Sequence, residues 1–182
     1  MSERWASLLA SHRAVREPQR VAAPEHKPVA AILACSDARV PPSLLFDQPA
    51  GSIFVVRVAG NTATPAAIAS LDYAVEELAV PLLIVLGHTG CGAVTAARSG
   101  KCHGYLSPIT QQICELDNQT HAATLDQLIE LNVLSAVTTL TNSLSPTGEG
   151  IRSGAVEVHG AVYDLSTDLV RPVQSAVTAA PS

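Results

Sequence analysis

Metal-binding side chains follow two short apolar runs of the sequence. Cys35 comes directly after the run 28–34, and His88 and Cys91 follow the run 82–86. In open α/β sheets, ligands gather at the carboxyl ends of the parallel strands. If the two runs form neighbouring strands, the three side chains converge on one point. Two thiolates and one imidazole suit Zn²⁺, so the sequence predicts a zinc site.

The segment that follows Cys35 offers two ways to complete this site. In an extended chain Cys35, Asp37 and Arg39 would share one face, because side chains alternate along a strand. Asp37 could be the fourth ligand, which would make the site closed and structural. Alternatively, Arg39 could hold Asp37 in a charge-assisted pair and leave the fourth position to water, as in a catalytic site. The residues alone leave both alternatives open.

The stretch from Ile32 to Val94 resembles the β-class carbonic anhydrases. Four motifs, which fall in the family's order and spacing, carry the resemblance: CSDARVPPSLLFDQ, FVVRVAGN, LDYAVEEL and LGHTGCGAV. The segment 159–165 also resembles the family, but more weakly than these four motifs. The resemblance implies that Zn²⁺ is held by Cys35, His88 and Cys91. It also implies that Asp37 and Arg39 act as a catalytic dyad on the fourth position, with Asp37 binding the metal only in a closed state.

The same resemblance implies reversible hydration of CO2 to bicarbonate and a proton, through attack by a zinc-bound hydroxide. Asp37 would orient this hydroxide, and Arg39 would keep Asp37 ionised. Gln48 and the backbone near Gly92 are candidate contacts for the substrate.

Some family members also have a regulatory bicarbonate pocket. Arg57 and Tyr163 match it, but Ile32 stands in place of its Trp, so this regulation is not expected. Arg57 is instead expected to fix a turn and a contact between subunits.

Two other functions use the same residues. A hydrolase of carbonyl sulfide or carbon disulfide would apply the same chemistry to a sulfur analogue of CO2. A non-catalytic zinc-stabilised oligomer or sensor would keep Asp37 fixed on the metal. Among the remaining histidines, His103 and His159 are candidate proton shuttles, because a near-neutral pKa permits that role, although solvated side chains are the more ordinary interpretation.

Composition limits the partners of the chain. Charged residues make up 15% of its 182 residues, against roughly 25% in a typical domain. Part of the surface is therefore expected to be covered by another copy, in a homodimer or homotetramer. The net charge of −5 argues against nucleic acid and anionic membranes as partners. No run approaches the ~20 apolar residues of a membrane span.

The N-terminus and the cysteines predict a cytoplasmic setting. Polar and charged residues recur at the N-terminus before any apolar region, so this stretch is not expected to be a signal peptide. In a reducing compartment, four cysteines suggest metal binding or chemistry rather than disulfides. Cys102 and Cys114 are accordingly interpreted as packing or surface thiols.

Periodicity predicts an α/β fold: a mostly parallel central sheet flanked by helices, with a C-terminal antiparallel strand or hairpin and an N-terminal helical arm. The arm and its linker cover 1–27, a single zinc-binding domain covers 28–173, and a disordered tail covers 174–182. Strands are expected at 28–34, 53–58, 82–86, 154–164 and 168–173. Helices are expected at 3–16, 40–46, 65–79, 91–99, 105–120 and 124–144, with a turn-rich loop at 145–150.

Overall fold

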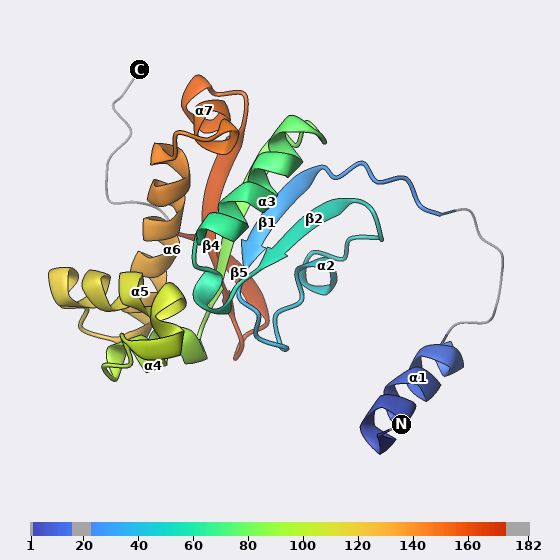
Figure 1. Ribbon diagram of the computed structural model, residues 1–182, viewed down its shortest axis with the longest axis horizontal. Helices are drawn as coiled ribbons and strands as arrows, with labels where there is room; N and C mark the ends of the chain where they lie inside the picture. The colour runs from blue at the N-terminus through green and yellow to red at the C-terminus, as the bar shows by residue number, and fades with distance from the viewer. Residues whose placement is uncertain (1, 16–22, 174–182) are drawn as a thin grey trace.

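Figure 1 shows the computed structural model, which describes residues 2–15 and 23–173. The N-terminal helix α1 (Glu3–Val15) lies apart from the rest of the chain, and its Trp5 and Leu8 side chains are 51% and 65% exposed. The predicted helical arm is therefore present. The predicted disordered tail and the 16–22 part of the predicted linker lie outside the described residues.

A five-stranded sheet forms the centre of the fold, in the order β2-β1-β3-β4-β5. The strands are β1 (Ala30–Ala34), β2 (Ile53–Arg57), β3 (Leu82–His88), β4 (Glu157–Asp164) and β5 (Leu169–Val173). The first four are parallel, and β5 pairs antiparallel with β4 as a hairpin. The predicted α/β fold is confirmed. Because β1 and β3 are parallel neighbours, their carboxyl ends lie at the same edge.

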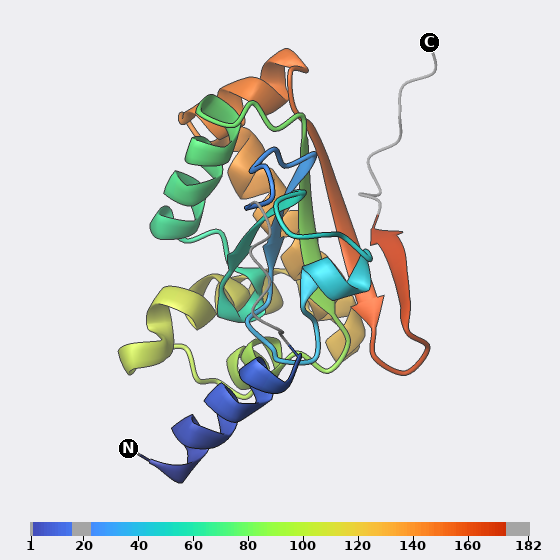
Figure 2. The same ribbon diagram turned by 90° about the vertical axis from the view of Figure 1, so that its right-hand side faces the viewer.

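Helices cover the sheet on both sides. Figure 2 shows α3 and α6 on one side of the sheet and α2 on the other. The helices that follow α1 are α2 (Pro42–Leu45), α3 (Pro65–Glu76), α4 (Gly92–Arg98), α5 (Ser107–Thr120), α6 (Leu125–Asn142) and α7 (Pro146–Ser153), with short 3-10 turns η1 (Ala59–Asn61) and η2 (Gly104–Leu106). The helix predicted from Thr64-Pro65 is confirmed, and the Thr64 hydroxyl accepts a hydrogen bond from the Ala67 N–H. Across the described ranges, no helix is both long and apolar enough to span a bilayer.

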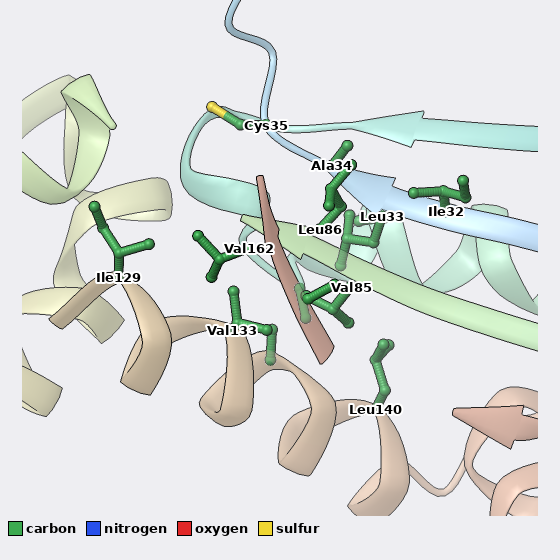
Figure 3. Packing of buried hydrophobic residues seen from close by; sticks show 14 of the residues in the cluster. Ile32, Leu33, Ala34, Cys35, Val85, Leu86, Ile129, Val133, Leu140 and Val162 are labelled. Atoms are coloured by element: carbon green, nitrogen blue, oxygen red, sulfur yellow. The ribbon is translucent and has the colours of Figure 1, made fainter. Parts of the chain in front are cut away.

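The long helix α6 packs directly on the centre of the sheet. Figure 3 shows its Ile129, Val133 and Leu140 side chains turned toward Val85 of β3 and Val162 of β4. These residues are almost completely buried. Since each buried side chain of this size contributes roughly 1.5–3 kcal/mol relative to an exposed one, this layer is a main source of the stability of the domain.

Two glycines allow α6 to come this close. A Cβ atom on Gly87 would lie 2.6 Å from Val133 Cγ2, and one on Gly160 would lie 2.8 Å from Val133 Cγ1. Both distances are shorter than real Cβ contacts. The absence of a side chain at these two positions therefore sets the distance between the helix and the sheet.

The structure corrects the prediction of a loop at 145–150. Helix α7 begins at Pro146 instead, because proline at a first helical position loses no hydrogen bond. The Asp72 carboxylate of α3 accepts a hydrogen bond from the Thr147 N–H at 3.0 Å. This cap comes from a residue 75 positions away, so the local turn residues did not reveal the helix.

The prediction that Cys102 and Cys114 are packing or surface thiols is also wrong. They form a disulfide, with their Cα atoms 6.0 Å apart. Cys102 lies in the segment between α4 and η2, and α5 then runs back along α4, which brings Cys114 opposite Cys102. The spacing of twelve residues carries no sign of this pairing.

The close approach of α6 generates a stability prediction. Gly160→Ala is expected to lower the free energy of unfolding by about 1–3 kcal/mol, because the new methyl group clashes with Val133. Val133→Ala removes the clashing atoms, so the double variant should lose less than the sum of the two single losses. Urea denaturation of the four proteins measures this coupling. Strictly additive losses would contradict the close contact.

Candidate metal centre

Three neighbouring segments supply the candidate ligands. Cys35 directly follows β1, His88 is the last residue of β3, and Cys91 is the N-cap residue of α4. The parallel pairing of Ala34 with Leu86 brings the first two to one edge. The chain then turns from strand to helix over three residues and returns Cys91 to the same edge.

The three side chains form a compact buried group. One ligand atom from each of Cys35, His88 and Cys91 lies within 4.8 Å of the others, and the two sulfurs are 3.9 Å apart. All three residues are at most 4% exposed. Tetrahedral Zn²⁺ with Zn–S bonds of about 2.3 Å would separate two sulfur ligands by roughly 3.8 Å. The spacing of the sulfurs therefore fits one shared tetrahedral metal.

The imidazole of His88 points to the same conclusion. Its Nδ1 lies 2.9 Å from the carbonyl oxygen of Thr89, which fixes the ring and leaves Nε2 as the free nitrogen. Among the described residues, the buried Nε2 has no hydrogen-bond partner. A buried polar atom without a partner costs about 1–3 kcal/mol, whereas a metal ion would satisfy it. The donor set and this unpartnered nitrogen together fit a metal ligated by Cys35, His88 and Cys91.

The two sulfurs influence each other strongly. A hydrogen bond from the Cys91 thiol lowers the pKa of Cys35 below that of an ordinary thiol, against the opposing effect of burial. His88 and the Gly60 N–H, which lies 3.3 Å from Cys35 Sγ, act in the same direction. The pKa of Cys91 is raised in turn, because Cys35 takes the hydrogen bond and Cys91 is buried. A hydrogen bond between the two sulfurs therefore favours a state in which one is a thiolate and the other keeps its proton.

Asp37 and Arg39 form a bidentate ion pair beside this group. Arg39 Nε and Nη2 donate to the two carboxylate oxygens of Asp37 at 2.9 and 2.7 Å, and the Arg39 N–H donates to Oδ1 at 3.0 Å. The side-chain bonds from Arg39 hold the pKa of Asp37 well below its usual range. Asp37 Oδ2 lies 3.9 Å from His88 Nε2. The carboxylate thus stands at the rim of the cluster while it is held by Arg39.

The chain is not extended from Cys35 to Arg39, so the condition under which these side chains would share one face is not met. The chain turns at Ala38–Arg39, so Cys35 is buried whereas the Arg39 side chain is 58% exposed. Arg39 reaches Asp37 through this turn, and not by sharing the face of a strand.

Arg57 holds the segment that carries these residues. It lies at the end of β2, and its Nε donates to the Cys35 carbonyl at 2.9 Å while Nη2 donates to the Asp37 carbonyl. The sequence prediction gave Arg57 a role in a turn and a subunit contact. The structure shows that it contacts the backbone of a candidate ligand and of the dyad aspartate.

The remaining candidate residues lie further from the cluster or are engaged locally. The Gln48 amide donates to the Phe46 carbonyl and accepts from the Ser52 hydroxyl. Gly92 is the first residue of α4, next to Cys91. His159 is exposed on β4 and pairs with Glu157 at 2.6 Å, and His103 is the exposed residue that precedes η2. No contact joins Gln48, His103 or His159 to the cluster in the part of the chain that the structure describes.

Fold and cluster together define an α/β protein with a candidate metal site at the carboxyl edge of its parallel strands. Residues 30–170 match the family model described as carbonic anhydrase. Carbonic anhydrase 2 of Mycobacterium tuberculosis is 35% identical over 147 residues, which cover 76% of this chain and 71% of that protein. The chain therefore belongs to the carbonic anhydrase family, and the solved structures place it in the β class of these enzymes.

Two of those structures cover nearly the whole chain. The β-carbonic anhydrase CafA of Aspergillus fumigatus has a TM-score of 0.77 at 27% identity, covering 97% of this chain and 88% of its own. A tetrameric β-carbonic anhydrase of Sordaria macrospora has a TM-score of 0.76 at 25% identity, covering 94% and 92%.

Sequence reasoning missed two residues that contact this region from a distance. Gly60 reaches the Cys35 sulfur, and Asn132 of α6 donates to the Gly60 carbonyl at 2.8 Å. One signal was available: Asn132 is a polar residue within the buried stripe of an otherwise apolar helix face. No local motif connects it with Cys35, which is 97 positions away in the sequence.

The geometry of the cluster predicts which histidine binds metal. His88→Ala is expected to reduce bound zinc from about one ion per chain to a small fraction, because the site loses its only nitrogen donor. The matched control is His159→Ala, which removes an exposed imidazole of the same chemistry. Elemental analysis of the dialysed proteins measures the zinc. Equal zinc in both variants would rule out His88 as a ligand.

Proposed function

We propose that this chain is a zinc-dependent enzyme that catalyses the reversible hydration of CO2 to bicarbonate and a proton. The proposal is carried by one observation, the buried group of Cys35, His88 and Cys91 with the Asp37–Arg39 pair at its rim. Membership of the carbonic anhydrase family supports it, as do relatives that carry that name. Zinc is the metal that two thiolates and an imidazole favour in a tetrahedral site.

Zinc bound to these three residues would supply Lewis acidity, lowering the pKa of a coordinated water toward neutrality. The residues of the chain would supply orientation. Asp37, at the rim beside His88, accepts a hydrogen bond from the attacking water and so directs its lone pair toward CO2. Because CO2 is apolar, it needs few polar contacts, and the Gly92 N–H at the start of α4 is a candidate for one of them. Gln48 stays a candidate contact.

The Arg39 pair favours a catalytic over a structural site. Both oxygens of Asp37 are engaged by Arg39, so the carboxylate is held away from the role of fourth ligand. This supports the enzyme over the non-catalytic oligomer or sensor, which requires Asp37 on the metal. For the sulfur analogues of CO2, assays with CO2 and carbonyl sulfide in parallel decide which substrate is preferred.

We also propose that the chain forms a homodimer or homotetramer. Helix α1 carries the exposed Trp5 and Leu8 away from its own domain, and the structurally similar protein of Sordaria macrospora is tetrameric. The cytoplasmic location stays a prediction. The Cys102–Cys114 disulfide is a feature that reducing compartments rarely maintain.

The orienting role of Asp37 predicts a separation of metal binding from turnover. Asp37→Asn should keep its zinc, because Asp37 is not part of the ligand group, but lose at least about 100-fold in CO2 hydration rate. Asp47→Asn, in the exposed loop after α2, is the matched control. Stopped-flow hydration assays with zinc quantified measure both effects. Normal turnover in Asp37→Asn would exclude this role.

The exposed face of α1 predicts an effect on assembly. Replacing Trp5 and Leu8 together by serine should lower the molecular mass in solution, because the helix loses the apolar side chains that we expect to contact another copy. Leu144→Ser, at a 97% exposed site between α6 and α7, serves as control. Light scattering coupled to size exclusion gives the masses. If the double variant keeps the wild-type mass, α1 does not hold the assembly together.

A further inference from the structure

Helix α6 buries one amide side chain, that of Asn132, against the η1 turn. Asn132 is 6% exposed and lies in the same buried stripe as Ile129 and Val133. Its Nδ2 donates a hydrogen bond of 2.8 Å to the carbonyl oxygen of Gly60. A buried amide is costly unless it is hydrogen-bonded, so this contact fixes where the side chain points.

Gly60 is the residue that touches the Cys35 sulfur through its backbone. It lies in η1 with φ 69° and ψ 19°, in the left-handed region that favours glycine. Its N–H donates to Cys35 Sγ at 3.3 Å. A Cβ at this position would lie 3.1 Å from Ala93 Cβ and 3.2 Å from Ile113 Cδ1, so a side chain there would require both neighbours to shift. Its carbonyl oxygen is thus the acceptor through which neighbouring side chains can hold Gly60 in place.

Other contacts hold the turn around Gly60 but not Gly60 itself. The Thr62 hydroxyl donates to the carbonyls of Ala59 and Ile109, at 3.1 and 3.3 Å, and so ties η1 to α5. Within residues 2–15 and 23–173, the hydrogen bond that reaches the Gly60 carbonyl from a side chain comes from Asn132. The Asn132 amide therefore holds the carbonyl of the residue whose N–H points at the sulfur.

We infer that Asn132 is a positioning residue of the metal centre: by holding the Gly60 carbonyl, it keeps the Gly60 N–H on the Cys35 sulfur and so limits the electron donation of that sulfur to the metal. The inference rests on the proposed function, since it requires that Cys35 ligates a metal. An N–H aimed at a thiolate withdraws electron density from the sulfur, and such outer contacts tune a metal through its ligands.

A purely structural role for Asn132 makes a different prediction. If the amide only satisfies a buried carbonyl, its loss lowers stability and leaves the electronic state of Cys35 unchanged. The energy of the sulfur-to-metal charge-transfer band separates the two roles, because it depends on the electron density at sulfur and not on the stability of the fold.

The experiment uses full-length protein loaded with Co²⁺, whose thiolate complexes absorb in the near ultraviolet. Asn132→Ala and the isosteric Asn132→Asp are compared with wild type, and Val133→Ala is the control for a destabilised α6. Both Asn132 variants should shift the band to lower energy, because the sulfur regains the electron density that the N–H withdraws. Val133→Ala should lose stability with the band unmoved.

An independent measurement uses wild type loaded with ¹¹³Cd. A scalar coupling between the Gly60 amide and the cadmium, transmitted through the Cys35 sulfur, is expected from an N–H···S hydrogen bond. Its absence would overturn the inference whatever the variants do.

Two results separate the inference from the proposed function. A wild-type protein with no thiolate band would contradict both the inference and the proposed function, because Cys35 would not be a ligand. A normal wild-type band that stays unchanged in the folded Asn132 variants would overturn only the positioning role and leave the proposed enzyme intact.

Discussion

The parallel pairing of β1 with β3 is the constraint on which the candidate metal centre depends. These two strands are separated by almost fifty residues of chain, including β2 and α3, yet they are hydrogen-bonded neighbours. Parallel pairing places both carboxyl ends at one edge, so Cys35 and His88 meet there without any long loop to hold them. The donors therefore stand on the ends of buried strands, where the surrounding packing limits their movement. A site on strand ends keeps its geometry better than one built on mobile loops.

Exposure increases in steps from the sulfurs to the dyad arginine. Cys35, His88 and Cys91 are almost completely buried, Asp37 is 19% exposed, and Arg39 is 58% exposed. Burial favours metal binding, since water competes poorly for the donors. The carboxylate stays charged at the rim because Arg39 compensates it with two hydrogen bonds. This gradient keeps the three candidate ligands away from solvent while the charged pair beside them faces it.

Much of this arrangement follows from local sequence. The apolar runs that became β1 and β3, and the Thr64-Pro65 start of α3, have physical signals within a few residues, and the resemblance to a known family pointed to the same donors. What the sequence could not reveal depends on contacts between distant residues. Helix α7 depends on Asp72 of α3, the Cys102–Cys114 disulfide depends on how α5 returns along α4, and Arg57 finds its carbonyl partners only once β2 lies beside β1.

Helix α6 links the packing of the core to the contacts around the Cys35 sulfur. Gly87 and Gly160 have no side chains, and α6 can therefore lie close enough for Val133 to touch both strands. The same approach brings the preceding residue, Asn132, to the Gly60 carbonyl. A side chain at either glycine would push α6 outward, and a hydrogen bond of 2.8 Å tolerates only a small displacement before it weakens. A side chain added at Gly87 or Gly160 is therefore expected to disturb the contact between Asn132 and Gly60, because it would displace α6.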